Sequence, residues 1–179
     1  MSTRAVARGL PASYGQEILA RRRRLTDSLI PLDGKIILDF GCGNGAQTME
    51  LRGGRRTIIA VDLGFEDLSI LRAAAGADRG VFPVLYDGTD LPLADGSVDV
   101  TVCYDVLEHV PDEAVALAEI RRVLKPGGEF LLTVPNKSWI FETHGAALPL
   151  LPWNRVPFFS WLPDPVHRRF AHARIYRKD

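Results

Sequence analysis

The stretch Ile37-Leu38-Asp39-Phe40-Gly41-Cys42-Gly43-Asn44-Gly45-Ala46 indicates the fold of this chain more clearly than any other part. Its apolar start, which extends back to Lys35, predicts a buried strand, and its glycines predict a tight turn that opens a helix. In open α/β sheets, ligands bind beyond the carboxyl ends of the strands, where such a turn lies. Gly41, Gly43 and Ala46 also satisfy the looser dinucleotide fingerprint. The stretch therefore indicates an adenosine-containing cofactor, with a purely structural turn as the alternative.

Short apolar runs alternate with helical patterns further along the chain. The runs predict strands at residues 57–62, 81–86, 98–104 and 130–134. The helical patterns predict one helix at 65–75 and another that begins after Asp112 and ends at Pro126-Gly127-Gly128. Continuous apolar strands separated by helices are typical of a parallel sheet covered on both faces. We therefore predict an α/β fold with a doubly wound, mostly parallel sheet.

The segment before this pattern predicts an amphipathic helix. Apolar residues recur at helical spacing between residues 13 and 30, and four arginines, 21–24, lie among them. Consecutive residues on a helix point about 100° apart, so the arginines ring it. We interpret them as a solvated surface rather than an anion-binding patch. The predicted organisation is a helical segment at 1–34, an α/β core at 35–135 and a tail at 136–179.

Charge is balanced overall and uneven along the chain. The sequence has 22 basic and 22 acidic side chains, yet residues 35–135 hold nine basic and sixteen acidic ones between two basic flanks. Overall neutrality argues against a nucleic-acid binder. Cys42 and Cys103 lack metal-ligand spacing and indicate a reducing compartment. No apolar run reaches the roughly 20 residues of a membrane span and no signal peptide is evident, so we expect a cytoplasmic protein.

The glycine stretch resembles the first motif of the class I S-adenosylmethionine-dependent methyltransferases, and the likeness continues over residues 35–136. Four later stretches resemble further motifs of that family, in the family's order. They are Asp87-Gly88-Thr89-Asp90-Leu91-Pro92-Leu93, Ser97-Val98-Asp99-Val100, Tyr104-Asp105-Val106-Leu107-Glu108-His109-Val110 and Leu124-Lys125-Pro126-Gly127-Gly128. The chain is most similar to the type 11 group, which includes ubiquinone- and menaquinone-biosynthesis enzymes. Dehydrogenases do not share the downstream segments. The resemblance therefore implies a Rossmann-like methyltransferase fold and disfavours a nicotinamide oxidoreductase.

The resemblance also implies a site for S-adenosylmethionine at the strand ends. Asp39 would accept from the donor's ammonium group, and the amides of residues 41–45 would meet its carboxylate. Asp62 would accept from the ribose hydroxyls, with Leu63 beside the adenine. Asp87 would accept from the adenine amino group, although turn chemistry is the alternative there. The implied set is Asp39, Phe40, Gly41, Cys42, Gly43, Asn44, Gly45, Asp62, Leu63, Asp87, Gly88, Tyr104 and Asp105.

The end of the fourth predicted strand supplies the rest of the implied site. Tyr104 and Asp105 would line the floor beneath the sulfonium. If the next residues turn helically, Asp105, Glu108 and His109 could converge on a cation, as in some ubiquinone-pathway and small-RNA methyltransferases. The first position of that family cluster is glutamate, and the shorter Asp105 would pull this ligand back. We therefore expect S-adenosylmethionine as the cofactor and no divalent cation.

Methyl transfer from S-adenosylmethionine is an in-line displacement, so alignment is the first contribution of the enzyme. An oxygen or nitrogen acceptor can also need a general base, and histidine exchanges protons near neutral pH. His109 and His144 are the candidates. The structural alternatives are capping or packing before Pro111 for His109 and packing in the tail for His144. The acceptor atom, oxygen, nitrogen or carbon, stays open.

The tail predicts an acceptor-side lid. Residues 148–163 are rich in aromatic residues and prolines, and the basic His167-Arg168-Arg169 follows, so we expect a small-molecule acceptor that is partly hydrophobic or anionic, with peripheral membrane contact as another option. The family sheet has seven strands and we count five, so we expect a truncated chain of weak stability with an open edge on the fifth strand. A non-catalytic donor-binding or scaffolding remnant is the alternative to an enzyme. The oligomeric state stays open.

Overall fold

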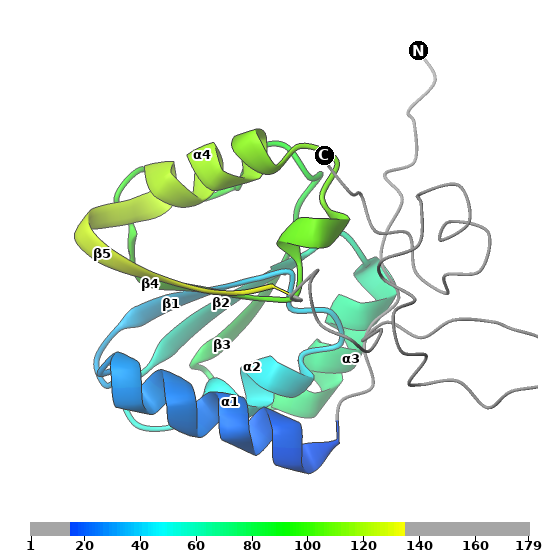
Figure 1. Cartoon of the computed structure of the whole chain (residues 1–179). Coiled ribbons are helices and arrows are strands. Elements are labelled where there is room, and N and C mark those ends of the chain that lie inside the picture. Colours follow the sequence, from blue (N-terminus) through cyan, green and yellow to red (C-terminus); the bar gives the residue numbers. More distant parts are fainter. Residues whose placement is uncertain (1–14, 135–179) are drawn as a thin grey trace, which may run out of the picture.

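The computed structural model describes residues 15–134 as one parallel sheet with helices on both faces (Figure 1). The strands are β1 (Ile36–Phe40), β2 (Thr57–Asp62), β3 (Val81–Leu85), β4 (Val98–Tyr104) and β5 (Leu124–Thr133). The helices are α1 (Gln16–Leu29), α2 (Ala46–Leu51), α3 (Phe65–Ala75), α4 (Glu113–Val123) and the short 3₁₀ helix η1 (Leu107–His109). Figure 1 shows α1, α2 and α3 on one face of the sheet and α4 on the other. The predicted doubly wound α/β fold is confirmed.

The strand order is β3-β2-β1-β4-β5, and every pairing is parallel. The chain reverses its direction of travel across the sheet between β1 and β4, which makes this pair the switch point where α/β sheets bind ligands. Phe40 at the end of β1 pairs with Val61, next to the end of β2. The segments that leave β1, β2, β3 and β4 therefore meet at one edge of the sheet.

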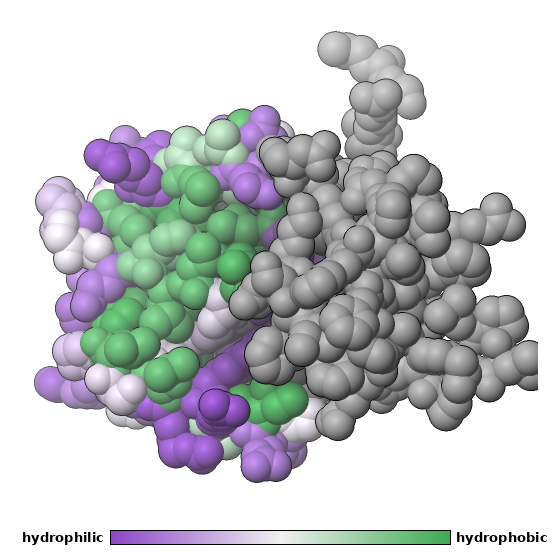
Figure 2. Space-filling model, viewed as in Figure 1, coloured by the Kyte–Doolittle hydropathy of each residue, from purple (hydrophilic) through white to green (hydrophobic). Residues whose placement is uncertain are grey.

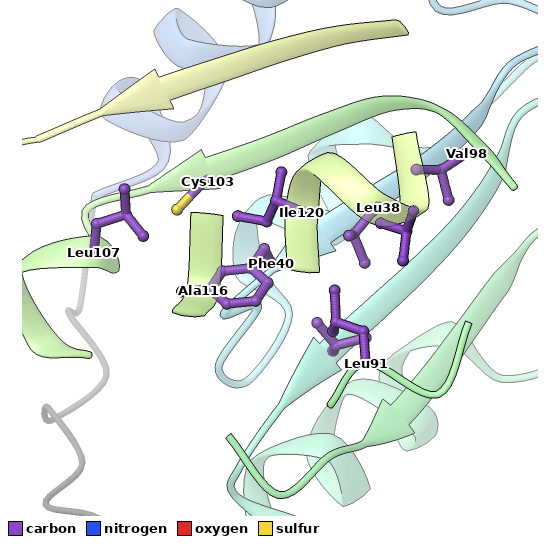
Figure 3. Close-up of a cluster of buried hydrophobic side chains, with 10 residues drawn as sticks. Leu38, Phe40, Leu91, Val98, Cys103, Leu107, Ala116 and Ile120 are labelled. Carbon is purple, nitrogen blue, oxygen red and sulfur yellow. The ribbon is translucent and has the colours of Figure 1, made fainter. Parts of the chain in front are cut away.

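Alternation along the strands divides the core into two layers. The layer against α4 is drawn in Figure 3, where side chains from β1, β4, α4 and the segment after β3 point toward one another. Its labelled members are Leu38, Phe40, Leu91, Val98, Cys103, Leu107, Ala116 and Ile120. The opposite layer contains Ile37, Val100 and Tyr104, in one cluster with residues that follow α1 and with the last residue of α2. Both faces of β1 and β4 are therefore buried, which explains their continuous apolar runs.

The boundary between α4 and β5 differs from the prediction. The helix ends at Val123 rather than at Pro126-Gly127-Gly128, and β5 begins at Leu124 rather than at Phe130. Leu124 pairs with Val98, and the register then shifts so that Val100 pairs with Glu129. Gly127 adopts a φ of +78° within this irregularity. The proline and glycines thus form a bulge inside the strand, because a bulge accommodates residues that cannot follow the regular ladder.

Asp99, near the start of β4, holds the end of the sheet away from the glycine turn. Its Oδ2 accepts from the backbone N–H of Ile36 at 2.8 Å, and its Oδ1 accepts from Nζ of Lys125 at 2.7 Å. These two donors keep the pKa of Asp99 below its usual value. Asp99 therefore joins β1, β4 and β5 at the end of the sheet away from the glycine turn.

Within the described sheet, β5 is an edge strand that pairs only with β4. Figure 2 shows apolar surface gathered on the side of the molecule where Figure 1 places β5. Leu132 of β5 and Val134 just after it are among the exposed apolar residues. Among residues 15–134, none of the helices is both long enough and apolar enough to cross a membrane. The predicted lid at 136–179, with His144, lies outside the described residues.

Candidate functional site

The turn after β1 depends on glycine at three positions. Gly41, Gly43 and Gly45 have φ values of +74°, +53° and +81°, a region that other L-residues adopt only at a cost. A Cβ on Gly41 would lie 2.5 Å from both Cγ atoms of Val106, and one on Gly45 would clash with Leu71 of α3. The turn is therefore wedged between α3 and the segment that leaves β4.

Backbone amides of the turn are held by β2. The N–H groups of Gly41 and Cys42 donate to the carbonyl of Val61 at 2.9 and 3.0 Å, and Gly45 donates to the carbonyl of Cys42. The N–H of Gly43 donates to Oδ2 of Asp62 at 2.8 Å. The expectation that these amides meet a ligand carboxylate does not fit these four donors, because each already has a protein acceptor.

Asp62 closes β2 and organises both neighbouring loops. Its side chain is largely buried, with Oδ2 accepting from Gly43 and Oδ1 accepting from the N–H of Gly64 at 2.8 Å. Asp62 therefore has a fixed position at the carboxyl end of β2, and its carboxylate is an acceptor of the kind that the predicted contact with ribose hydroxyls needs.

Asp39 occupies a more enclosed position than the prediction assumed. Its side chain is 2% exposed, and its Oδ2 accepts from the hydroxyl of Thr48 on α2 at 2.6 Å. Burial raises the pKa of Asp39 to about 6, and the charge of Asp62 raises it further. The hydrogen bond from Thr48 to Asp39 thus links α2 to β1. A direct contact between Asp39 and a ligand ammonium stays a prediction.

The other predicted residues of the turn are used for packing and capping. Phe40 lies on the α4 face with its ring centroid 5.7 Å from that of Tyr86. Cys42 is buried in the cluster beside α3. Oδ1 of Asn44 accepts from the N–H of Ala46 at 3.3 Å, at the start of α2. The recorded contacts of these three side chains are therefore with the protein's own core and with the start of α2.

The segment that leaves β3 approaches the segment that leaves β2. Gly88 has a φ of +92°, and a Cβ there would lie 3.3 Å from Cδ2 of Leu63. Asp87 closes a turn through one oxygen: its Oδ1 accepts from the N–H and hydroxyl of Thr89 and from the N–H of Asp90. These bonds lower the pKa of Asp87. Asp87 thus does form the turn that was the alternative to ligand binding. Within residues 15–134, every recorded hydrogen bond to the Asp87 carboxylate goes to Oδ1 and none to Oδ2.

Asp105 follows β4 in an unusual backbone conformation. Its φ is +55°, the only positive value at a non-glycine position among residues 15–134. Its N–H donates to the carbonyl of Thr133 at 2.9 Å, and its Oδ1 accepts from the Thr133 hydroxyl at 3.0 Å. Its Oδ2 accepts a charge-assisted hydrogen bond from Arg22 of α1. Contacts with β5 and with α1 therefore hold the carboxylate in place.

Tyr104 is oriented toward α1. Its hydroxyl lies 2.5 Å from that of Thr26, and the guanidinium of Arg22 lies 5.5 Å from the centre of its ring. Burial raises the pKa of Tyr104 to about 12. The interpretation of the arginine run as a solvated surface is therefore wrong for Arg22. It is also wrong for Arg23, which donates to the carbonyls of Glu50 in α2 and of Arg52 just after it.

The alternative of a cation cluster at Asp105, Glu108 and His109 is not assembled within the described residues. No three His, Cys, Asp or Glu side chains there come together as a metal-binding group. Asp105 is turned toward Arg22 and Thr133, whereas Glu108 and His109 belong to η1, whose last residue donates its N–H to the carbonyl of Val106. His109 is half-buried just beyond β4, and His144 lies outside the described residues.

Sequence reasoning missed Thr48, Arg22, Thr26 and Thr133, which hold three of the predicted site residues. The spacing of Arg22 and Thr26, four residues apart on one helix face, was the only available signal for that pair. Thr48 and Thr133 carry no such signal, because hydroxyl side chains are common throughout helices and strands. Their roles depend on the arrangement of the elements in space.

Comparisons with known proteins agree with this geometry. Residues 38–132 match the family described as "Methyltransferase domain". The ubiquinone biosynthesis O-methyltransferase of Thiobacillus denitrificans is 36% identical over 162 residues, which cover 87% of this chain and 70% of that protein. An S-adenosylmethionine-dependent methyltransferase structure from Mesorhizobium loti shares the fold, with a TM-score of 0.61, 24% identity and coverage of 90% of this chain and 77% of that one.

A second solved structure widens the range of chemistry found on this fold. The [4+2]-cyclase SpnF is 27% identical, with a TM-score of 0.59 over 69% of this chain and 49% of its own. The chain thus spans about half the length of that neighbour and 70% of the Thiobacillus protein. Since one neighbour is named for a cyclisation, the fold alone does not identify the reaction.

Proposed function

This chain belongs to the S-adenosylmethionine-dependent methyltransferases, and we propose that it transfers a methyl group to a hydroxyl oxygen of a small molecule in ubiquinone biosynthesis. The observation that carries this proposal is the position of Asp62, whose carboxylate holds the glycine turn at the switch point of the sheet. The choice of oxygen and of a ubiquinone precursor is supported by the name of the Thiobacillus relative.

The residues at the strand ends fit the donor. Asp62 supplies acceptors for the ribose, while Leu63 and Gly88 lie side by side where the adenine would bind. Asp87 has an oxygen that takes no part in its turn, which suits the adenine amino group. When bound, S-adenosylmethionine supplies an electrophilic methyl group on a cationic sulfur.

The electrostatics of this edge also suit a cationic donor. Asp39, Asp62 and Asp87 lie at or near the carboxyl ends of β1, β2 and β3, while Asp105 after β4 is paired with Arg22. Asp39 and Asp62 are close enough for the charge of one to raise the pKa of the other. Such a concentration of carboxylates favours binding of positive charge.

A hydroxyl acceptor must lose its proton as its oxygen takes the methyl group. His109 follows β4 in η1, at the same edge of the sheet as the glycine turn. We assign it the role of the base that accepts this proton, with His144 as the second candidate. Asp105 and Tyr104, held by α1, form the rigid border beside it.

Donor binding is tested by titration calorimetry of the chain with S-adenosylmethionine and with NAD. We expect binding of the first and not of the second. Asp62→Asn should weaken donor binding at least about tenfold, because a charged acceptor is lost. Asp78→Asn, an exposed carboxylate in the loop before β3, is the matched control and should leave the affinity unchanged. Equal affinities for the donor and NAD would contradict the proposal.

Transfer is tested with hydroxylated aromatic acceptors, with and without an alkenyl chain, read by the mass increase of one methyl group. Matched amino analogues of each acceptor test the choice of oxygen. His109→Gln should lower kcat and leave the donor affinity unchanged. Donor binding without methylation of any acceptor would support the alternative of a non-catalytic binder and contradict the proposed transfer.

A further inference from the structure

Within residues 15–134, a polar cluster outside the site joins α4 to the segment between β3 and β4. Arg122 donates from its guanidinium to the carbonyls of Leu91 and Leu93 at 3.0 and 2.8 Å, and to Oδ1 of Asp95 at 2.7 Å. It also forms a bidentate pair with Glu119, both contacts being 2.7 Å. The predicted sequence motifs assign no role to either residue.

Glu119 and Arg122 bind both backbone polar groups of Leu91. Arg122 binds the carbonyl of Leu91, while Oε2 of Glu119 accepts from its N–H at 2.8 Å. The guanidinium holds the pKa of Glu119 below its usual value, so the carboxylate stays charged. A planar guanidinium can bind several acceptors in fixed directions, whereas a lysine ammonium acts as a point charge. These two hydrogen bonds therefore fix the direction of the backbone at Leu91 as well as its position.

Leu91 is the first anchored residue after the exposed turn at residues 87–90. Its side chain is 3% exposed and points into the core layer against α4 (Figure 3). On the other side of the turn, the N–H of Tyr86 donates to the carbonyl of Asp62 at 3.2 Å. Asp87 lies between these two anchors, and its only recorded hydrogen bonds within residues 15–134 are to its own turn. The position of the Asp87 carboxylate therefore depends on where Leu91 is held.

We propose that Glu119 and Arg122 are positioning residues for recognition of the purine amino group of the donor. By holding Leu91, they place the turn at residues 87–90 so that Oδ2 of Asp87 can accept from that amino group. This inference rests on the proposed function, because it assumes that the adenine binds beside Leu63 and Gly88. It predicts selectivity against purines that carry a carbonyl at the same position, since two acceptors would then face each other.

The test compares the affinities of S-adenosylhomocysteine and S-inosylhomocysteine for the full chain. The two ligands differ at the purine amino group, so their affinity ratio reports the position of Asp87 rather than overall stability. Arg122→Lys should reduce the wild-type preference for the adenosyl ligand about tenfold, as loss of a hydrogen bond to a charged group would. Asp87→Asn should reduce it comparably. Arg121→Lys, the neighbouring exposed arginine, is the matched control and should leave the ratio unchanged.

A purely structural role for the pair gives a different result. With such a role, Arg122→Lys would lower the affinities for both ligands by the same factor. An affinity ratio that is unchanged from the wild type therefore overturns the inference. Glu119→Gln provides a second variant should Arg122→Lys fold poorly, with circular dichroism confirming the native helix content. If the wild type binds neither ligand, the proposed function fails and the inference fails with it; binding with an unaltered ratio in the variants removes the inference alone.

Discussion

Arg22 of α1 forms an ion pair with Asp105, 83 residues further along the chain at the end of β4. Both side chains are largely shielded from solvent, and Asp105 has the backbone conformation that needs such support. The helix before the sheet therefore fixes the carboxylate that follows β4, next to the proposed donor site.

Removal of the Arg22 side chain should destabilise the fold locally and weaken donor binding. Arg22→Ala leaves the Asp105 carboxylate with Thr133, and we expect a loss of about 1–3 kcal/mol in the free energy of unfolding. Urea unfolding measures this loss. Arg24→Ala, on the exposed side of α1, should change it by less than about 0.5 kcal/mol. Equal losses in the two variants would contradict the role given to the ion pair.

The hydrogen bond between Thr26 and Tyr104 has a defined direction. The Thr26 hydroxyl donates its one proton to the carbonyl of Arg22 at 2.8 Å, so Tyr104 must be the donor in the contact between the two hydroxyls. Thr26→Val would leave a buried O–H without its acceptor, at a cost of about 1–3 kcal/mol, whereas Tyr104→Phe removes the donor itself and should cost less. In a double-mutant cycle, the double variant should be less destabilised than the sum of the two.

Stability should depend on pH through Asp39. Its pKa of about 6 in the folded chain exceeds the ordinary value of 3.8, so between these values the folded state binds the proton more tightly than the unfolded state. The free energy of unfolding should therefore fall as pH rises through this window, by about 3 kcal/mol at most. Asp39→Asn keeps an acceptor for Thr48 and should flatten this dependence. Urea unfolding at a series of pH values measures it, and parallel curves would contradict the assignment.

Alanine substitutions at two glycines with nearly the same φ distinguish the cost of backbone strain from the cost of a steric clash. Gly34 and Gly41 have φ values of +73° and +74°, but a Cβ on Gly34 meets nothing within 4 Å, whereas one on Gly41 meets Val106. Gly34→Ala should cost about 1–2 kcal/mol, from the backbone conformation alone. Gly41→Ala should cost more and should abolish donor binding. The combination with Val106→Ala should recover part of the stability; no recovery would place the cause elsewhere.

Local chemistry made much of the scaffold predictable. The continuous apolar runs predicted the strands at 57–62 and 98–104 with the bounds that the structure has, because strands buried on both faces are apolar throughout. The helical pattern predicted the helix at 65–75 equally well. The glycine turn was predictable for a different local reason, since glycine adopts positive φ values at no steric cost. The start of β5 was missed because its bulge depends on pairing with β4, which residue preferences do not encode.

The contacts around the site follow from the order of the strands. Thr48 binds Asp39 within one β–α unit, but Arg22 reaches Asp105 only because β4 lies beside β1 and α1 lies on the same face of the sheet as α2. Glu119 and Arg122 likewise reach Leu91 only because α4 folds back over the segment that precedes β4. Periodicity reports whether a residue is buried and not which residue it will meet. The candidate residues for donor binding could therefore be proposed from the chain alone, whereas the residues that hold them in position emerged from long-range packing.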